Sequence, residues 1–104
     1  MKQYNKAVRD HIPTIIRAQG KACQAEQVSD ADYLTYMEAK LSEELAEYQE
    51  SPCVEELADL LEVIYRVAEL RGVSREELEE VRRKKREDRG GFAENWVLVV
   101  ADEE

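Results

Sequence analysis

Two pairs of acidic residues lie on either side of Ser51-Pro52, near the middle of this 104-residue chain. Glu44 and Glu47 form the first pair, and Glu56 and Asp59 form the second. Each pair has i,i+3 spacing, which places both members on one face of a helix. Because the pairs are symmetric about the turn, an antiparallel helical hairpin would set Glu44 opposite Asp59. Glu47 and Glu56 would then face each other nearer the loop. Carboxylates that converge in this way repel one another unless a cation lies between them, so the pattern predicts a magnesium site.

Capping residues delimit the two helices of this hairpin. Ser29 or Asp30 can cap a helix that runs to about residue 50. Ser51 can cap the next helix, with Pro52 in its first turn, and Gly72 can stop it. Both helices have an apolar stripe. The stripes comprise Leu34, Met37, Leu41, Leu45 and Tyr48 in the first helix, and Leu57, Leu60, Leu61, Ile64, Val67 and Ala68 in the second.

Two further helices are predicted outside the hairpin. Pro13 can begin a short helix that Gly20 ends. Ser74 and Glu77 have the spacing of a capping box, which predicts a fourth helix to about Arg89.

Two short segments favour strands. Residues 22–28 alternate weakly between apolar and polar side chains, and residues 96–100 read Trp-Val-Leu-Val-Val. Pairing of these segments predicts a small two-stranded β appendage. The expected fold is therefore mainly α, an antiparallel helical hairpin bundle, in a single domain over residues 1–104.

The composition excludes several classes of function. A net charge of −9 repels phosphates overall, which argues against nucleic-acid and anionic-membrane partners. No apolar run approaches the ~20 residues of a membrane span, and the N-terminus lacks a signal-peptide core. Cys23 and Cys53 are too few for a disulfide framework, and a single histidine leaves no zinc pattern. We therefore expect a cytoplasmic protein with reduced thiols.

Basic residues supply charge that could complement a phosphorylated ligand. Lys40 precedes Glu44 by four residues, so it can pair with that carboxylate or reach a phosphate. Residues 81–89 hold six cations, and Lys85 and Arg89 share one helical face. These two side chains can neutralise a polyphosphate, although a solvated face near a helix C-terminus is the simpler alternative for the run. Glu43, Glu55 and Glu62 are expected to be solvated or to support the ligands.

The acid pairs and their neighbours resemble a known signature. Residues 40–47 (Lys-Leu-Ser-Glu-Glu-Leu-Ala-Glu) and 55–61 (Glu-Glu-Leu-Ala-Asp-Leu-Leu) resemble the all-α nucleoside triphosphate pyrophosphatases. That superfamily includes the MazG proteins, the dimeric dUTPases and phosphoribosyl-ATP pyrophosphohydrolase. Residues 4–13 and 83–92 resemble a small MazG-like, phosphoribosyl-ATP-pyrophosphohydrolase-like subgroup.

The resemblance implies hydrolysis of the α–β phosphate bond of a nucleotide, with Mg²⁺ or Mn²⁺, releasing a monophosphate and pyrophosphate. The resemblance also implies that the four paired acids are the metal ligands and that Lys85 and Arg89 bind phosphate. It also implies a homodimer or homotetramer with the active site at a subunit interface, which agrees with apolar stripes that one hairpin cannot cover.

Three departures from the family pattern bear on the substrate. The gap of eight residues between the acid pairs is short, which leaves little room for a base-recognising loop. His11 stands where lysine is expected, and Arg83 replaces an asparagine. Three interpretations follow: a house-cleaning nucleoside triphosphate pyrophosphohydrolase, a phosphoribosyl-ATP pyrophosphohydrolase, or a non-catalytic helical interaction module.

Overall fold

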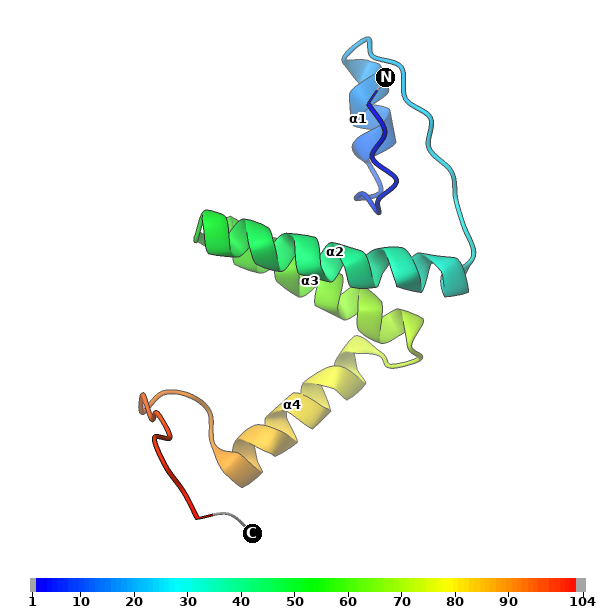
Figure 1. The fold of residues 1–104 in the computed structure, drawn as a ribbon. Helices are drawn as coiled ribbons and strands as arrows, with labels where there is room; N and C mark the ends of the chain where they lie inside the picture. Colours follow the sequence, from blue (N-terminus) through cyan, green and yellow to red (C-terminus); the bar gives the residue numbers. More distant parts are fainter. Residues whose placement is uncertain (1, 103–104) are drawn as a thin grey trace.

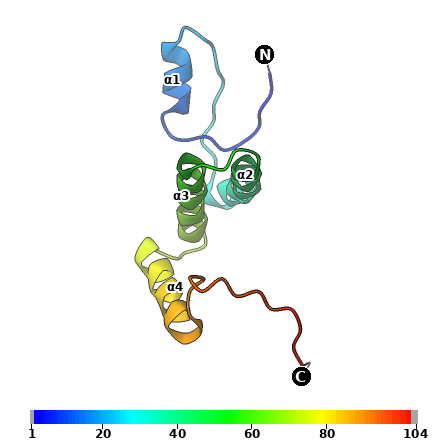
Figure 2. The ribbon, with the colours of Figure 1, turned by 90° about the vertical axis from the view of Figure 1, so that its left-hand side faces the viewer.

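The structure, a computed structural model, describes residues 2–102 and is mainly helical, as predicted. Its helices are α1 (Ile12–Ala18), α2 (Asp30–Glu50), α3 (Val54–Leu70) and α4 (Arg75–Arg89) (Figure 1). Helices α2 and α3 form the predicted hairpin, and α1 and α4 lie on opposite sides of it (Figures 1 and 2). None of the described helices is long and apolar enough to cross a membrane.

The N-termini of α2 and α4 begin at the predicted caps. The Ser29 hydroxyl accepts the Asp32 N–H at 3.2 Å. The Ser74 hydroxyl accepts the Glu77 N–H at 3.1 Å and donates to the Glu77 carboxylate at 3.1 Å. Each serine thus satisfies an N–H group that has no partner within its own helix.

We expect Ser74→Ala to lower the free energy of unfolding by about 1 kcal/mol, because the Glu77 N–H loses its acceptor. Chemical denaturation monitored by circular dichroism measures this loss. Ser42→Ala, at an exposed position inside α2, is the matched control and should cost nothing. Equal stability of the two variants would show that the cap contributes little.

The start of α3 differs from the prediction. Ser51 belongs to the end of α2, where its N–H donates to the Glu47 carbonyl at 2.9 Å. Cys53 is the residue before α3, and its side chain makes no capping bond. The chain therefore uses residues 51–53 to reverse direction, so Ser51 is not the cap of α3 and Pro52 precedes the helix rather than lying in its first turn.

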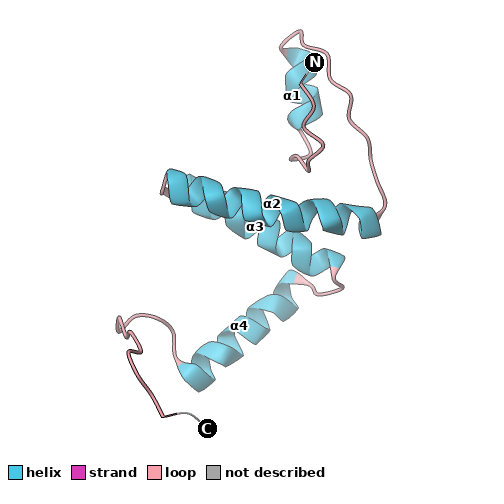
Figure 3. Ribbon diagram, viewed as in Figure 1, coloured by secondary structure: helices cyan, strands magenta, loops and turns pink. Residues whose placement is uncertain are grey.

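The predicted β appendage is wrong for the part of the chain that the structure describes. Residues 22–28 and 96–100 are both irregular, and loops and helices account for all of residues 2–102 (Figure 3). The two segments lie on opposite sides of the α2–α3 hairpin in both views (Figures 1 and 2). A strand needs a neighbour to pair its backbone groups, and neither segment has one.

The core lies between α2, α3 and the N-terminal segment. Met37, Val63 and Ala7 are its buried residues, and half-buried side chains pack against them. Those side chains are Tyr33, Leu41, Val67 and Leu70. The predicted stripes are thus only partly covered, since Leu45, Leu57, Leu61 and Ile64 remain 37–47% exposed.

Candidate metal-binding site

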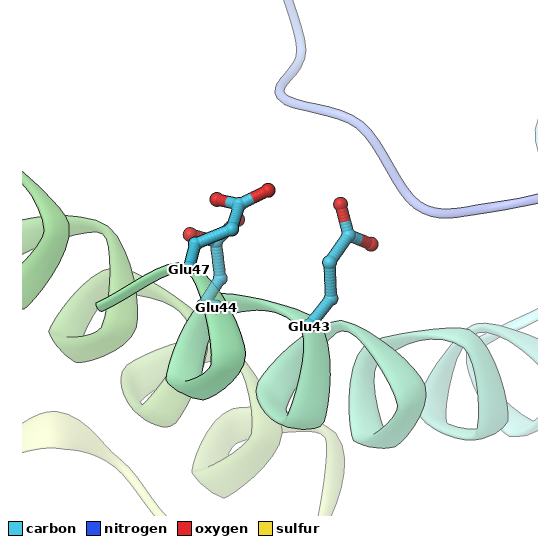
Figure 4. A group of neighbouring side chains, drawn as sticks. All are labelled: Glu43, Glu44 and Glu47. Carbon is cyan, nitrogen blue, oxygen red and sulfur yellow. The ribbon is translucent and has the colours of Figure 1, made fainter. Parts of the chain in front are cut away.

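The α2–α3 hairpin brings the four predicted metal ligands together. Glu44, Glu56 and Asp59 each offer a carboxylate oxygen within 4.8 Å of the others. Glu43, Glu44 and Glu47 form a second such group, so Glu44 belongs to both. Figure 4 shows the three α2 carboxylates pointing from the helix toward the N-terminal segment. We call Glu43, Glu44, Glu47, Glu56 and Asp59 the acid cluster.

Two carboxylate oxygens of the acid cluster are buried without a partner. Glu44 is only 6% exposed, and its Oε2 atom finds no hydrogen bond among the described residues. The Oε2 atom of Glu56 is also buried and has no hydrogen-bond partner among the described residues. A buried carboxylate oxygen without a hydrogen bond costs free energy, because it has lost its water and gained no donor. The hairpin thus holds acceptor oxygens that a cation would satisfy.

The electrostatics agree with this geometry. Burial, followed by the charge of Glu47, raises the pKa of Glu44 above its ordinary value. Burial also raises the pKa of Glu56, with further contributions from Glu47 and Asp59. A proton is one way to relieve the repulsion among these acids, and a metal ion is another.

Lys40 supplies one positive charge at the edge of the acid cluster. Its Nζ atom lies 3.4 Å from Glu44 Oε1 and 3.3 Å from Glu43 Oε1. Of the two roles predicted for Lys40, the pairing with Glu44 is therefore present. The Lys40 side chain is 15% exposed and faces two carboxylates, so one ammonium group leaves the cluster strongly negative.

The sequence did not predict the roles of Glu43, Lys6 and Arg9. Glu43, expected to be solvated or to support the ligands, joins the acid cluster and accepts a hydrogen bond from Lys6 Nζ at 2.7 Å. This bond is the main reason why the pKa of Glu43 is lowered. Arg9 Nη2 donates to Asp59 Oδ1 at 2.7 Å. The i,i+4 spacing of Glu43 and Glu47 was a usable signal, but nothing in the sequence brings residues 6 and 9 to the hairpin.

The two cations predicted to bind phosphate lie elsewhere in the chain. Lys85 and Arg89 are at the C-terminal end of α4, which points away from the hairpin (Figure 1). They line a shallow basic hollow with Arg82, Arg86, Gly90, Gly91 and Phe92. Within one chain, the structure therefore does not bring Lys85 and Arg89 together with the acid cluster.

The donor set of the acid cluster fits a hard divalent cation. Mg²⁺ takes oxygen ligands at ~2.1 Å and keeps several waters, so a few carboxylates on facing helices suffice to hold it. All of the clustered groups are carboxylates, and sulfur and imidazole ligands are absent from them. Glu44, Glu47, Glu56 and Asp59 would hold Mg²⁺ or Mn²⁺.

Comparisons with known proteins leave the family of this chain open. No family model matches the sequence, and no solved structure matches the fold. An uncharacterized protein of Mycolicibacterium smegmatis is 48% identical over 40 residues. That match covers 38% of this chain and 41% of the relative. The fold and the site therefore define the class only as a mainly helical protein with an all-carboxylate candidate metal site.

Proposed function

We propose that this protein is a Mg²⁺-dependent nucleotide pyrophosphohydrolase that converts a nucleoside triphosphate into a monophosphate and pyrophosphate. The observation that carries the proposal is that the hairpin gathers Glu44, Glu47, Glu56 and Asp59 into two groups that share Glu44. The Oε2 atoms of Glu44 and Glu56 are buried there without a partner among the described residues. The resemblance of residues 40–47 and 55–61 to the all-α pyrophosphatases supports the same reaction. Removal of surplus or non-standard nucleotides from a cytoplasmic pool is the proposed role.

The chemistry assigns different tasks to the carboxylates. When bound, Mg²⁺ supplies a Lewis acid that offsets the charge of the triphosphate and acidifies a water molecule. Glu44, Glu56 and Asp59, whose carboxylate oxygens lie within 4.8 Å of one another, would hold the cation together with Glu47. Glu47, which shares a group with Glu44, would also orient the attacking water and accept its proton. The water oxygen bonds to the α-phosphorus as the bond from that phosphorus to the bridging oxygen breaks, and pyrophosphate leaves with the electron pair.

Pyrophosphate release from a panel of nucleotides tests the proposal directly. The panel contains ribo- and deoxyribonucleoside triphosphates and phosphoribosyl-ATP, each with Mg²⁺, with Mn²⁺ and with EDTA. Metal-dependent release establishes the reaction, and the best substrate separates house-cleaning from the phosphoribosyl-ATP pyrophosphohydrolase alternative. No release by a folded, metal-loaded sample would refute the proposal for these substrates and favour the interaction module.

We also propose that the chain assembles as a homodimer or homotetramer. Leu57, Leu61 and Ile64 share one face of α3 at i, i+4 and i+7, and they are 37–47% exposed. An apolar helical face of this kind is usually covered in a stable bundle. A second copy would cover it, and would also allow Lys85 and Arg89 of one chain to approach the acid cluster of another.

We expect Leu61→Glu to shift the assembly toward monomer, because burying a carboxylate in an apolar interface is costly. Light scattering after size-exclusion chromatography measures the mass against the 12.0 kDa of one chain. Val28→Glu is the control, since Val28 is 41% exposed but lies in the loop before α2. A wild-type protein that stays monomeric at every concentration would contradict the proposed assembly.

A further inference from the structure

The N-terminal segment crosses the hairpin and brings two cations to the acid cluster. Lys6 Nζ lies 2.7 Å from Glu43 Oε1, and Arg9 Nη2 lies 2.7 Å from Asp59 Oδ1. These pairs join residues that are 37 and 50 positions apart in the sequence. We call residues 6–9 the cationic strap. Figure 4 shows the N-terminal segment above the α2 carboxylates, on the side toward which they point.

Contacts that do not involve charge anchor the strap. Ala7 is 5% exposed and belongs to the core with Met37 and Val63. The Tyr33 hydroxyl donates to the Val8 carbonyl at 3.5 Å. The backbone between Lys6 and Arg9 is thus held on the hairpin by packing. The two side chains would therefore stay near the acid cluster even if their ion pairs broke.

The ion pairs of the strap are open to solvent. The side chains of Lys6 and Glu43 are 39% and 28% exposed, and those of Arg9 and Asp59 are 59% and 38% exposed. Exposed pairs contribute little to stability, because water screens them and long side chains lose freedom. A divalent ion can therefore replace Arg9 at Asp59 at low cost. Arg9, once displaced, would lie beside the bound metal with no acid of its own, while Lys6 would stay at Glu43, which shares a group with Glu44 and Glu47.

Phosphate oxygens are the partners that such cations recognise. The arginine guanidinium presents a planar fork of donors that matches phosphate, and the lysine ammonium binds it as a point charge. Lys40 is less available for this role, because it is largely buried between Glu43 and Glu44.

We propose that Lys6 and Arg9 bind the phosphate chain of the nucleotide substrate, and that the same side chains pair with the acid cluster when metal is absent. This inference rests on the proposed function, because it takes the acid cluster as the metal site. It assigns the phosphate-binding cations within one chain to the N-terminal strap rather than to α4. Anchoring by Ala7 lets the strap exchange its charge partners without leaving the hairpin.

Two binding measurements test the strap without requiring turnover. The test variant is Lys6→Ala/Arg9→Ala, and the control is Arg17→Ala/Lys21→Ala, which removes the same charge from exposed positions outside the acid cluster. The first measurement is Mn²⁺ binding without nucleotide, followed by electron paramagnetic resonance. The second is binding of α,β-methylene-ATP, which cannot be cleaved at the α–β position, by calorimetry in the presence of Mg²⁺.

We expect the test variant to bind Mn²⁺ about two- to fivefold more tightly than the control, because a weak competing cation has gone. We expect its affinity for α,β-methylene-ATP to fall about tenfold for each cation removed, since charged hydrogen bonds to phosphate are lost. The KM for a cleavable nucleotide should rise in parallel. Circular dichroism confirms that both variants are folded.

The outcomes separate the two proposals. If the unaltered protein and the test variant bind α,β-methylene-ATP equally well, or if Mn²⁺ binding does not tighten, the strap proposal is wrong and the proposed function stands. If the analogue binds and the strap substitutions weaken its binding, but no cleavable nucleotide is hydrolysed, the strap proposal is supported and the proposed hydrolase function is wrong. A protein that binds neither Mn²⁺ nor the analogue would overturn both.

Discussion

Glu56→Gln and Asp59→Asn are each expected to abolish pyrophosphate release, with a loss of at least about a thousandfold. Both residues share a group with Glu44 in which carboxylate oxygens lie within 4.8 Å. An amide in place of a carboxylate removes a negative ligand, and metal catalysis contributes several kcal/mol, with each ~1.4 kcal/mol worth tenfold. The helical circular dichroism should be unchanged, because each substitution keeps the size of the side chain.

The control for this experiment is Glu62→Gln, which makes the same chemical change on α3 at an exposed position outside the acid cluster. It should retain full activity. If the Glu56 and Asp59 variants also retain full activity with the best substrate, the assignment of the metal ligands is wrong.

Mg²⁺ is expected to raise the melting temperature of the protein, and Glu44→Gln is expected to remove this response. Binding to the folded state alone stabilises by about 2.7 kcal/mol at one hundred times the dissociation constant. For a domain of this size that corresponds to roughly 10–20 °C. Differential scanning calorimetry with Mg²⁺, against NaCl of equal ionic strength, measures the shift.

Without metal, Glu44→Gln should melt at a higher temperature than the wild type at neutral pH. Burial raises the pKa of Glu44 in the folded state, so its contribution to stability is full below the unfolded value and is lost as pH rises through the folded value. The ionised carboxylate therefore opposes folding at neutral pH, and a neutral amide does not. The difference between the two proteins should shrink as the pH falls. A lower melting temperature for the variant at neutral pH would contradict this account of the acid cluster.

Local signals predicted most of the helices. Ser29 and Ser74 are caps because their hydroxyls reach backbone N–H groups within the next few residues. Gly90, with φ of 84°, ends α4 in a conformation that favours glycine. The strand prediction was wrong because propensity alone cannot supply a partner: Val97–Val100 are 80–84% exposed. Ser51 is not the cap of α3, because α2 extends to Glu50 and α3 begins only at Val54, which leaves Ser51 at the end of α2.

The sequence by itself determined that the two acid pairs meet, and the tertiary structure decided which cations meet them. The i,i+3 pairs on either side of a tight turn converge because helix periodicity and hairpin symmetry are local geometry. Lys6 and Arg9 reach the acid cluster because Ala7 is buried against Met37 and Val63, a packing contact between distant parts of the chain. Lys85 and Arg89 lie apart from it because α4 extends away from the hairpin. Spacing along a helix is enough to predict that the acid pairs meet. The approach of the cations depends instead on the burial of apolar surface between segments that no local pattern connects.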